Sequence, residues 1–140
     1  IKVKYSKLKS IVISKKLAPY LIDEYPILAV AASQAKGTTV MKGLDELRFK
    51  ESDRLRSIHD NLLCSGIDSN IVKDDIIISG STSIIPGGNK IDSFHDHRIA
   101  MSFSILNLIC KKPLKINNIK CIDISYPKFN QDLKSILLNA

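Results

Sequence analysis

Apolar residues follow two spacings along this chain, one typical of helices and one typical of short strands. The run Ile27–Ala32 (ILAVAA) is apolar on every side, which predicts a helix over Asp23–Ala35 that is buried all round. A single apolar stripe predicts a second helix over Glu51–Ser65. The same reasoning predicts helices Asp96–Ile109 and Pro127–Leu138, strands Lys9–Ser14, Thr38–Lys42, Ile67–Lys73, Asp75–Ser79 and Pro113–Asn117, and a Ser/Pro/Gly-rich loop Ser81–Asn89.

The order of these predicted elements repeats. The same order of elements starts at Asp23 and again at Asp96: an acidic residue, then an apolar helix, a break and a short strand. This order suggests two strand–helix–strand–helix units spaced by about 70 residues. The 140 residues suffice for one core of ordinary size. We therefore predict one α/β (α+β) domain over 1–140, with approximate units 1–80 and 81–140.

Composition adds a basic surface with few arginines. The formal net charge is +7, and 17 of the 21 basic residues are lysine. A lysine-covered solvated surface explains most of this charge, and attraction of an anionic partner is the alternative. Nucleic acid is disfavoured, because the chain has no Trp and only 6% aromatic residues for stacking. Arginine offers a rigid fork for carboxylate or phosphate, so the four arginines (Arg48, Arg54, Arg56 and Arg98) mark the candidate sites.

The cysteines and the longest apolar stretch bear on location. Three cysteines (Cys64, Cys110 and Cys121) have neither metal-ligand spacing nor an even count, which predicts reduced, packed thiols in the cytoplasm and no metal site. The stretch Ile99–Cys110 is interrupted by serines and is far shorter than the roughly 20 residues of a membrane span, so no membrane association is expected. The chain begins with Ile1 rather than methionine, which suggests a processed or excised piece.

Cations lie at two predicted helix starts, where the helix dipole disfavours them. His97 and Arg98 follow the predicted N-cap Asp96, and Lys50 and Arg54 stand four residues apart at the start of the second helix. A bound anion would make both arrangements favourable, because backbone N–H groups and side-chain cations would converge on it. The alternative is local neutralisation of each cation by a neighbouring carboxylate (Glu51, Asp53 or Asp96).

Carboxylates beside these cations are candidates for proton transfer. Glu51 adjoins Lys50, and Asp23 precedes the most apolar helix, where its alternative role is a plain N-cap. His97 is a candidate general acid or hydrogen-bond donor. No nucleophile motif and no phosphate-binding glycine loop is present in the sequence. The residues alone thus predict a small-anion site with nearby carboxylates and do not specify the reaction.

The same segments match a known family. Leu47–Leu55 (LRFKESDRL), Asp96–Met101 (DHRIAM) and Asp23–Ala32 (DEYPILAVAA), the last followed by Gly37–Thr39 (GTT), resemble signature segments of 5-enolpyruvylshikimate-3-phosphate synthases. The resemblance implies an inside-out α/β barrel of βαβαββ repeats, with helices inside and sheets outside. About two repeats are present, so the chain resembles the C-terminal part of the second lobe and would need the missing N-terminal lobe.

The reaction implied by the resemblance transfers the enolpyruvyl group of phosphoenolpyruvate to the 5-hydroxyl of shikimate 3-phosphate and releases phosphate. It needs cations for the anionic groups, a base and an acid. By match of motif, Asp23 would bind shikimate 3-phosphate and act as base, Glu51 would donate the proton, and Lys50 would contact both substrates. Arg54 and Arg98 would hold phosphoenolpyruvate. The chain alone would be inactive.

The remaining implications complete these expectations. His97 would line the same pocket as a catalytic residue, and no metal or organic cofactor is implied. Some members of the family carry a lysine where this chain has Ile124, and Lys120 or Lys128 is a possible replacement. Two alternatives stay open: a non-catalytic basic binding module for nucleic acid or a protein partner on an enzyme-like fold, and a related transferase with a different acceptor.

Overall fold

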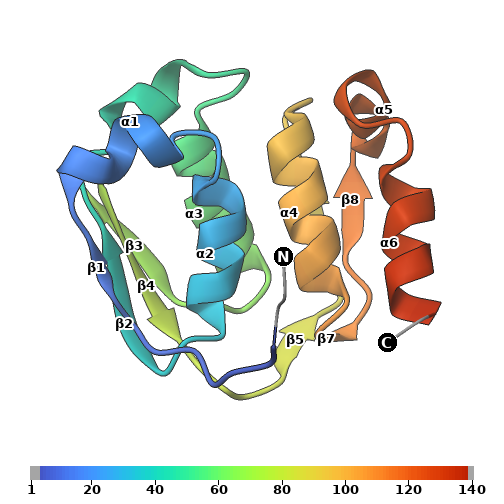
Figure 1. Cartoon of the computed structure of the whole chain (residues 1–140), viewed down its shortest axis with the longest axis horizontal. Helices are drawn as coiled ribbons and strands as arrows, with labels where there is room; N and C mark the ends of the chain where they lie inside the picture. The colour runs from blue at the N-terminus through green and yellow to red at the C-terminus, as the bar shows by residue number, and fades with distance from the viewer. Residues whose placement is uncertain (1–3, 139–140) are drawn as a thin grey trace.

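A mixed sheet of four strands forms one side of the computed structural model, which describes residues 4–138 (Figure 1). Its outer strand β1 pairs parallel with β2, and the other pairings are antiparallel. Ile76 and Ile78 alternate with more exposed residues along β4 and are fully buried, as expected for a sheet with one face on the core. The strand order is β1 (Val12–Ile13), β2 (Gly37–Met41), β4 (Asp75–Gly80), β3 (Ser69–Val72).

Two small parallel sheets form the other side. β5 (Ile85–Gly87) pairs with β7 (Cys110–Lys112), and β6 (Lys90–Asp92) pairs with β8 (Lys115–Asn117). The prediction of an uninterrupted loop over Ser81–Asn89 is therefore wrong, since β5 lies within it. Pro86 fits in β5 because the pairing uses the residues on either side of it, and proline has no N–H to donate to the ladder.

Within residues 4–138, six α-helices connect and cover these strands: α1 (Ala18–Leu21), α2 (Tyr25–Ser33), α3 (Arg54–Cys64), α4 (His97–Asn107), α5 (Ile122–Ser125) and α6 (Phe129–Leu138). Three short 3₁₀ helices, Lys15–Leu17, Asp45–Phe49 and Ile119–Cys121, precede α1, α3 and α5. The four predicted helices are confirmed with shortened ends, whereas α1, α5, β6 and β7 are additions. The helix predicted over Asp96–Ile109 ends at Asn107, because β7 begins at Cys110.

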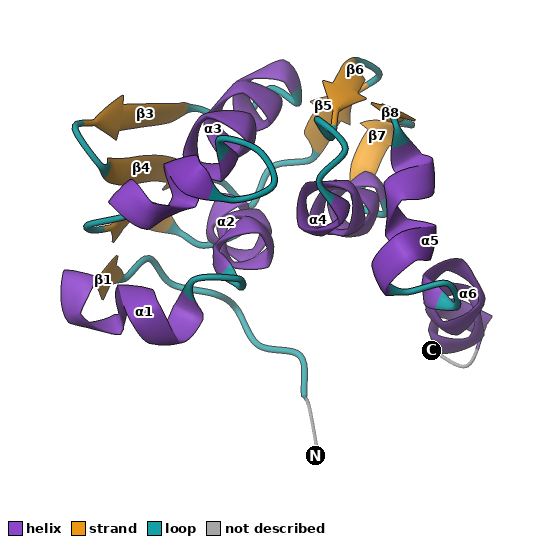
Figure 2. Ribbon diagram, turned by 90° about the horizontal axis from the view of Figure 1, so that it is seen from above, coloured by secondary structure: helices purple, strands orange, loops and turns teal. Residues whose placement is uncertain are grey.

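α2 and α4 pack against each other in the middle of the molecule (Figure 2). The four-stranded sheet lies beside α2 and α3, and the two small sheets lie beyond α4. The expectation that α2 is buried all round is wrong in part. Ala31 is exposed, and Ile27 and Leu28 are only half-buried, because Leu28 and Ala31 line an open pocket with Leu8 and Ile11 instead of packing closely against them. The described residues thus form a mixed helix–strand fold and do not close into a barrel.

The main hydrophobic core draws residues from both halves, and a second, smaller cluster lies between α4 and α5. The main core includes the stripe of α3 (Leu55, Ile58 and Leu62) together with Phe103 and Leu106 of α4. Cys121 is buried, while Cys64 and Cys110 are half-buried against the core, and all three are free thiols. Between residues 4 and 138, no helix combines the length and apolar character needed to cross a bilayer.

Candidate functional site

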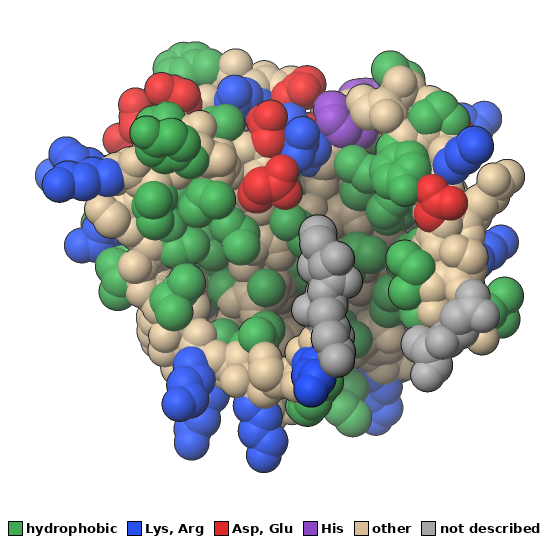
Figure 3. All heavy atoms as spheres, viewed as in Figure 1, with side chains coloured by type: hydrophobic (Ala, Val, Ile, Leu, Met, Phe, Trp, Pro, Cys, Tyr) green, Lys and Arg blue, Asp and Glu red, His purple; other side chains and the backbone are tan. Residues whose placement is uncertain are grey.

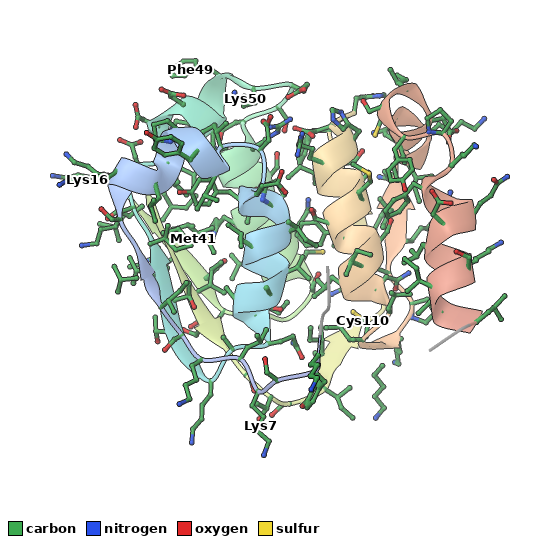
Figure 4. All side chains as sticks on the ribbon, in the orientation of Figure 1. Lys7, Lys16, Met41, Phe49, Lys50 and Cys110 are labelled. Atoms are coloured by element: carbon green, nitrogen blue, oxygen red, sulfur yellow. The ribbon has the colours of Figure 1, made fainter. Side chains whose placement is uncertain are left out.

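The N-terminal ends of α2, α3 and α4 lie at the same end of the molecule (Figure 1). Acidic, basic and histidine side chains gather on the surface there, whereas the opposite end shows mainly lysine or arginine side chains (Figure 3). Lys50 also lies at this end, and Lys7 lies at the other (Figure 4). Helix N-termini present unpaired N–H groups, so their convergence favours anions.

α3 begins at Arg54 because Asp53 caps it. The Asp53 Oδ1 atom accepts a hydrogen bond of 3.0 Å from the backbone N–H of Arg56. Lys50 therefore precedes the helix, in extended backbone after the 3₁₀ helix Asp45–Phe49. The prediction that Lys50 and Arg54 both lie at the start of this helix is therefore wrong for Lys50.

α4 begins at His97, and Asp96 is its N-cap, as predicted. Asp96 Oδ1 accepts hydrogen bonds from the backbone N–H groups of Arg98 at 2.9 Å and Ile99 at 3.4 Å. His97 is half-buried in the first turn of the helix. The cap thus fixes the backbone from which His97 and Arg98 project.

Arg54 is the centre of the site, with only 1% of its surface exposed. Its Nε donates to Asp96 Oδ2 at 2.7 Å, its Nη1 donates to Asp23 Oδ1 at 2.8 Å, and its Nη2 donates to Glu51 Oε2. A buried guanidinium requires such partners, since its desolvation is otherwise very unfavourable. Arg54 therefore joins residues that lie before α2, α3 and α4.

Arg98 reaches the same carboxylate from α4. Its Nη1 donates to the backbone oxygen of Asp23 at 2.9 Å, and its Nη2 lies 3.5 Å from Asp23 Oδ2. A further ion pair joins Arg98 to Glu24 at 3.4 Å. The plain N-cap role considered for Asp23 is wrong, because Glu24 occupies the N-cap position of α2 and Asp23 bridges the two arginines.

Electrostatics keep Asp23 ionised. Partial burial alone would raise the pKa of Asp23, but the hydrogen bond from Arg54 and the charges of Arg98, Arg54 and Lys50 outweigh it and hold that pKa below its ordinary value. Lys50 therefore acts on the same carboxylate as the arginines. Asp23 is the anion shared by all three cations of the site.

Nearly all charges of the site are paired. Four carboxylates, Asp23, Glu24, Glu51 and Asp96, face the cations Lys50, Arg54 and Arg98. Carboxylates thus neutralise the arginines, but only the Arg54–Glu51 pair is the local neutralisation considered as the alternative to an anion site. The other pairs join residues far apart in the sequence. The side chains of Asp23 and Glu51 are 43% and 49% exposed, whereas Asp96 is fully buried. An incoming anion can therefore replace Asp23 or Glu51 on Arg54 far more easily than Asp96.

Five of the predicted site residues come together: Asp23, Lys50, Glu51, Arg54 and Arg98. His97 adjoins them through its place in the first turn of α4. The sequence reasoning missed the second role of Asp96 as the buried partner of Arg54. The signal for that role was its position directly before His97 and Arg98, but the capping role already explained an aspartate there.

Other candidates lie outside this cluster. Arg48 pairs with Asp53 and Asp74 on the far side of the α3 cap. Ile124 is exposed, and with Lys120 it lines a cavity of about 580 Å³ near α5. Replacement of the family lysine by Lys120 or Lys128 stays a prediction. Within residues 4–138, no group of three or more His, Cys, Asp or Glu side chains is arranged to hold a metal ion.

Sequence comparisons place this chain in a family. The family model for EPSP synthase (3-phosphoshikimate 1-carboxyvinyltransferase) matches residues 2–133. A 3-phosphoshikimate 1-carboxyvinyltransferase of Persephonella marina is 44% identical over 138 residues, which cover 98% of this chain and 32% of the relative. The protein of that name from Methylobacterium sp. (strain 4-46) is 42% identical and matches 97% of this chain and 30% of its own length. The chain thus spans about a third of these relatives.

Structural comparisons agree. An EPSP synthase structure from Acinetobacter baumannii has a TM-score of 0.84 and 43% identity, over 89% of this chain and 29% of that one. The enolpyruvyl transferase NikO from Streptomyces tendae shares the fold, with a TM-score of 0.61 and 20% identity over 81% of this chain and 24% of its own. The chain belongs to the EPSP synthase family.

Proposed function

We propose that this chain supplies part of the active site of an enzyme that transfers the enolpyruvyl group of phosphoenolpyruvate to the 5-hydroxyl of shikimate 3-phosphate, with release of phosphate. One observation carries the proposal: Arg54 and Arg98 both bind Asp23 where three helices begin. Membership of the EPSP synthase family supports this choice of substrates.

The cations bind phosphoenolpyruvate in this proposal. Its phosphate and carboxylate groups match the forked donors of Arg54 and Arg98, which then exchange the exposed carboxylates for the ligand. Lys50 contacts both substrates, and His97 lines the pocket from the first turn of α4. The N-termini of α3 and α4 add favourable electrostatics for the developing phosphate charge.

Asp23 and Glu51 perform proton transfer. In the addition step, Asp23 takes the proton of the attacking hydroxyl while Glu51 donates a proton to the methylene carbon of phosphoenolpyruvate, which gives a tetrahedral intermediate. In the elimination step, the methyl group returns a proton to Glu51 as the bond from carbon to the phosphate oxygen breaks, so that the enolpyruvyl double bond forms again. The leaving phosphate takes the proton from Asp23. When the ligand replaces Asp23 on Arg54 and Arg98, Asp23 loses the hydrogen bond from Arg54, and the negative charge of the ligand offsets the cations that lower the pKa of Asp23. Ligand binding therefore makes Asp23 a stronger base at the moment at which the reaction needs one.

The chain needs the rest of a family-length polypeptide. Because the site has four carboxylates and only three cations, it cannot bind a multiply charged anion tightly. The chain alone is therefore inactive, and the rest of the polypeptide supplies further cations. That part also completes the inside-out barrel, to which 1–80 and 81–140 contribute two repeat units of a single partial domain. Cytoplasmic location and the exclusion of nucleic acid stay predictions.

A hybrid protein tests the proposal. In this hybrid, the chain replaces the matching 138 residues of the Persephonella marina relative. We expect it to release phosphate only when both substrates are present, while the 140-residue chain alone releases none. A folded hybrid that releases no phosphate, in an assay in which the unaltered relative does, would overturn the proposal.

A further inference from the structure

Asp96 differs from the other carboxylates of the site because it is fully buried and both of its oxygens are engaged. Oδ1 caps α4 by accepting from the backbone of Arg98 and Ile99. Oδ2 accepts from Arg54 Nε at 2.7 Å and from Ser52 Oγ at 3.2 Å. One side chain thus joins the start of α4 to the start of α3.

The geometry divides the donors of Arg54 into two sets. Nε points to buried Asp96, while Nη1 and Nη2 point to the half-exposed carboxylates of Asp23 and Glu51. Water or an anion can replace the exposed partners, whereas replacing Asp96 would leave a buried charge unpaired. Arg54 therefore keeps one permanent partner while its terminal donors remain exchangeable.

We propose that Asp96 is a positioning residue, which holds Arg54 by Nε and Arg98 by its backbone N–H so that both guanidinium groups face one anion. The proposal rests on the proposed function of the site. Asp96 itself need not touch the ligand. Its effect is to fix the two arginines, which come from different helices, in one relative orientation before binding, so that binding does not have to order them.

The turn before α4 supports this role. Phe94 and His95 both have left-handed backbones, with φ of 52° and 60°, which residues other than glycine rarely adopt. Asp92 Oδ1 holds this turn by accepting from the Phe94 backbone N–H at 2.8 Å. Unfavourable backbone conformations persist where surrounding contacts require them. Here the turn directs Asp96 inward, into contact with Arg54.

Asp53 provides a matched control. It caps α3 as Asp96 caps α4, and its second oxygen also pairs with an arginine, Arg48, which lies outside the site. The variants Asp96→Ser and Asp53→Ser both keep a capping hydroxyl and both lose an arginine partner. Only Asp96→Ser releases Arg54, so a comparison of the two separates positioning of Arg54 from helix capping.

The test measures steady-state kinetics of the hybrid protein. We expect Asp96→Ser to raise the KM for phosphoenolpyruvate roughly tenfold or more, the loss expected for one charge-assisted hydrogen bond, and to leave the KM for shikimate 3-phosphate within about twofold. Asp53→Ser should change neither KM by more than about twofold. Equal effects of the two variants on the KM for phosphoenolpyruvate would overturn the proposal.

Ser52→Ala covers the case in which Asp96→Ser does not fold. It removes the 3.2 Å hydrogen bond to Asp96 together with the 3.4 Å hydrogen bond from Ser57 Oγ, and we expect roughly a threefold rise in the KM for phosphoenolpyruvate alone. An unchanged KM in a folded Ser52→Ala hybrid would then contradict the proposal. An unaltered hybrid without activity would refute the proposed function instead, so the two failures are distinguishable.

Discussion

Replacing Arg54 by methionine should destabilise the fold more than any other change at the site. Arg54 is 1% exposed and its partner Asp96 is 0% exposed, so Arg54→Met leaves a buried carboxylate without its cation. Removing one member of a buried ion pair destabilises by about 3–5 kcal/mol. Asp23 and Glu51 are about half exposed and regain water, so each adds at most about 1 kcal/mol.

The assay is urea unfolding of the 140-residue chain at pH 7, followed by far-ultraviolet circular dichroism. Arg56→Met is the matched control, because Arg56 lies on the same helix but is 74% exposed in its pair with Asp60. We expect the control to change the free energy of unfolding by less than about 1 kcal/mol. Arg54→Met combined with Asp96→Asn should be more stable than Arg54→Met alone, since the unpaired buried charge is gone. Equal losses for Arg54→Met and Arg56→Met would refute the reasoning.

Three further predictions concern stability. Tyr25→Phe should raise the free energy of unfolding by about 1 kcal/mol in urea titrations, because the buried Tyr25 hydroxyl has no hydrogen-bond partner among the described residues; a loss of stability would show that it has one. Gly80→Ala should lower the free energy of unfolding by about 1–3 kcal/mol, since an added Cβ meets the carbonyl oxygens of Ala32 and Ala35. An unchanged urea midpoint would contradict this close approach. Asp23→Asn should be less stable than the parent above about pH 5, and the difference in the free energy of unfolding should vanish as the pH falls well below about 4. The reason is that the pKa of Asp23 is lowered in the folded state, so its stabilising effect is lost when it is protonated. A difference independent of pH would contradict this assignment.

The long helices could be predicted because their signals are local. Asp96 precedes an apolar run, and it caps α4 as expected. The spacing of Leu55, Ile58 and Leu62 predicted which face of α3 is buried, and all three side chains are buried. The short parallel strands β5, β6 and β7 could not be predicted in this way, whereas β1 and β8 lie within predicted strands. β5 contains Pro86 and is a strand only because residues 110–112, far along the chain, pair with it.

The sequence indicated which residues gather at the site, but not which of them form hydrogen bonds and ion pairs with one another. Scarce arginines at helix starts indicated Arg54 and Arg98, and both contact Asp23. That Arg54 is buried, and that Asp96 rather than Glu51 is its most buried partner, depends on contacts across 42 residues of sequence. Local charge patterns contain no information about such distant pairing. The open flank of α2 likewise reflects what packs beside the helix rather than its own composition.

In the proposed function, Arg54 and Arg98 together hold phosphoenolpyruvate. The most direct test is calorimetric titration of phosphoenolpyruvate into the hybrid protein in the presence of shikimate 3-phosphate, with Arg98→Ala compared against Arg56→Ala. Arg98 contacts Asp23 and Glu24 at the site, whereas Arg56 lies in an exposed ion pair with Asp60 on α3. We predict that Arg98→Ala weakens binding at least about tenfold while Arg56→Ala stays within about twofold of the parent. Equal affinities for the two variants would contradict the account.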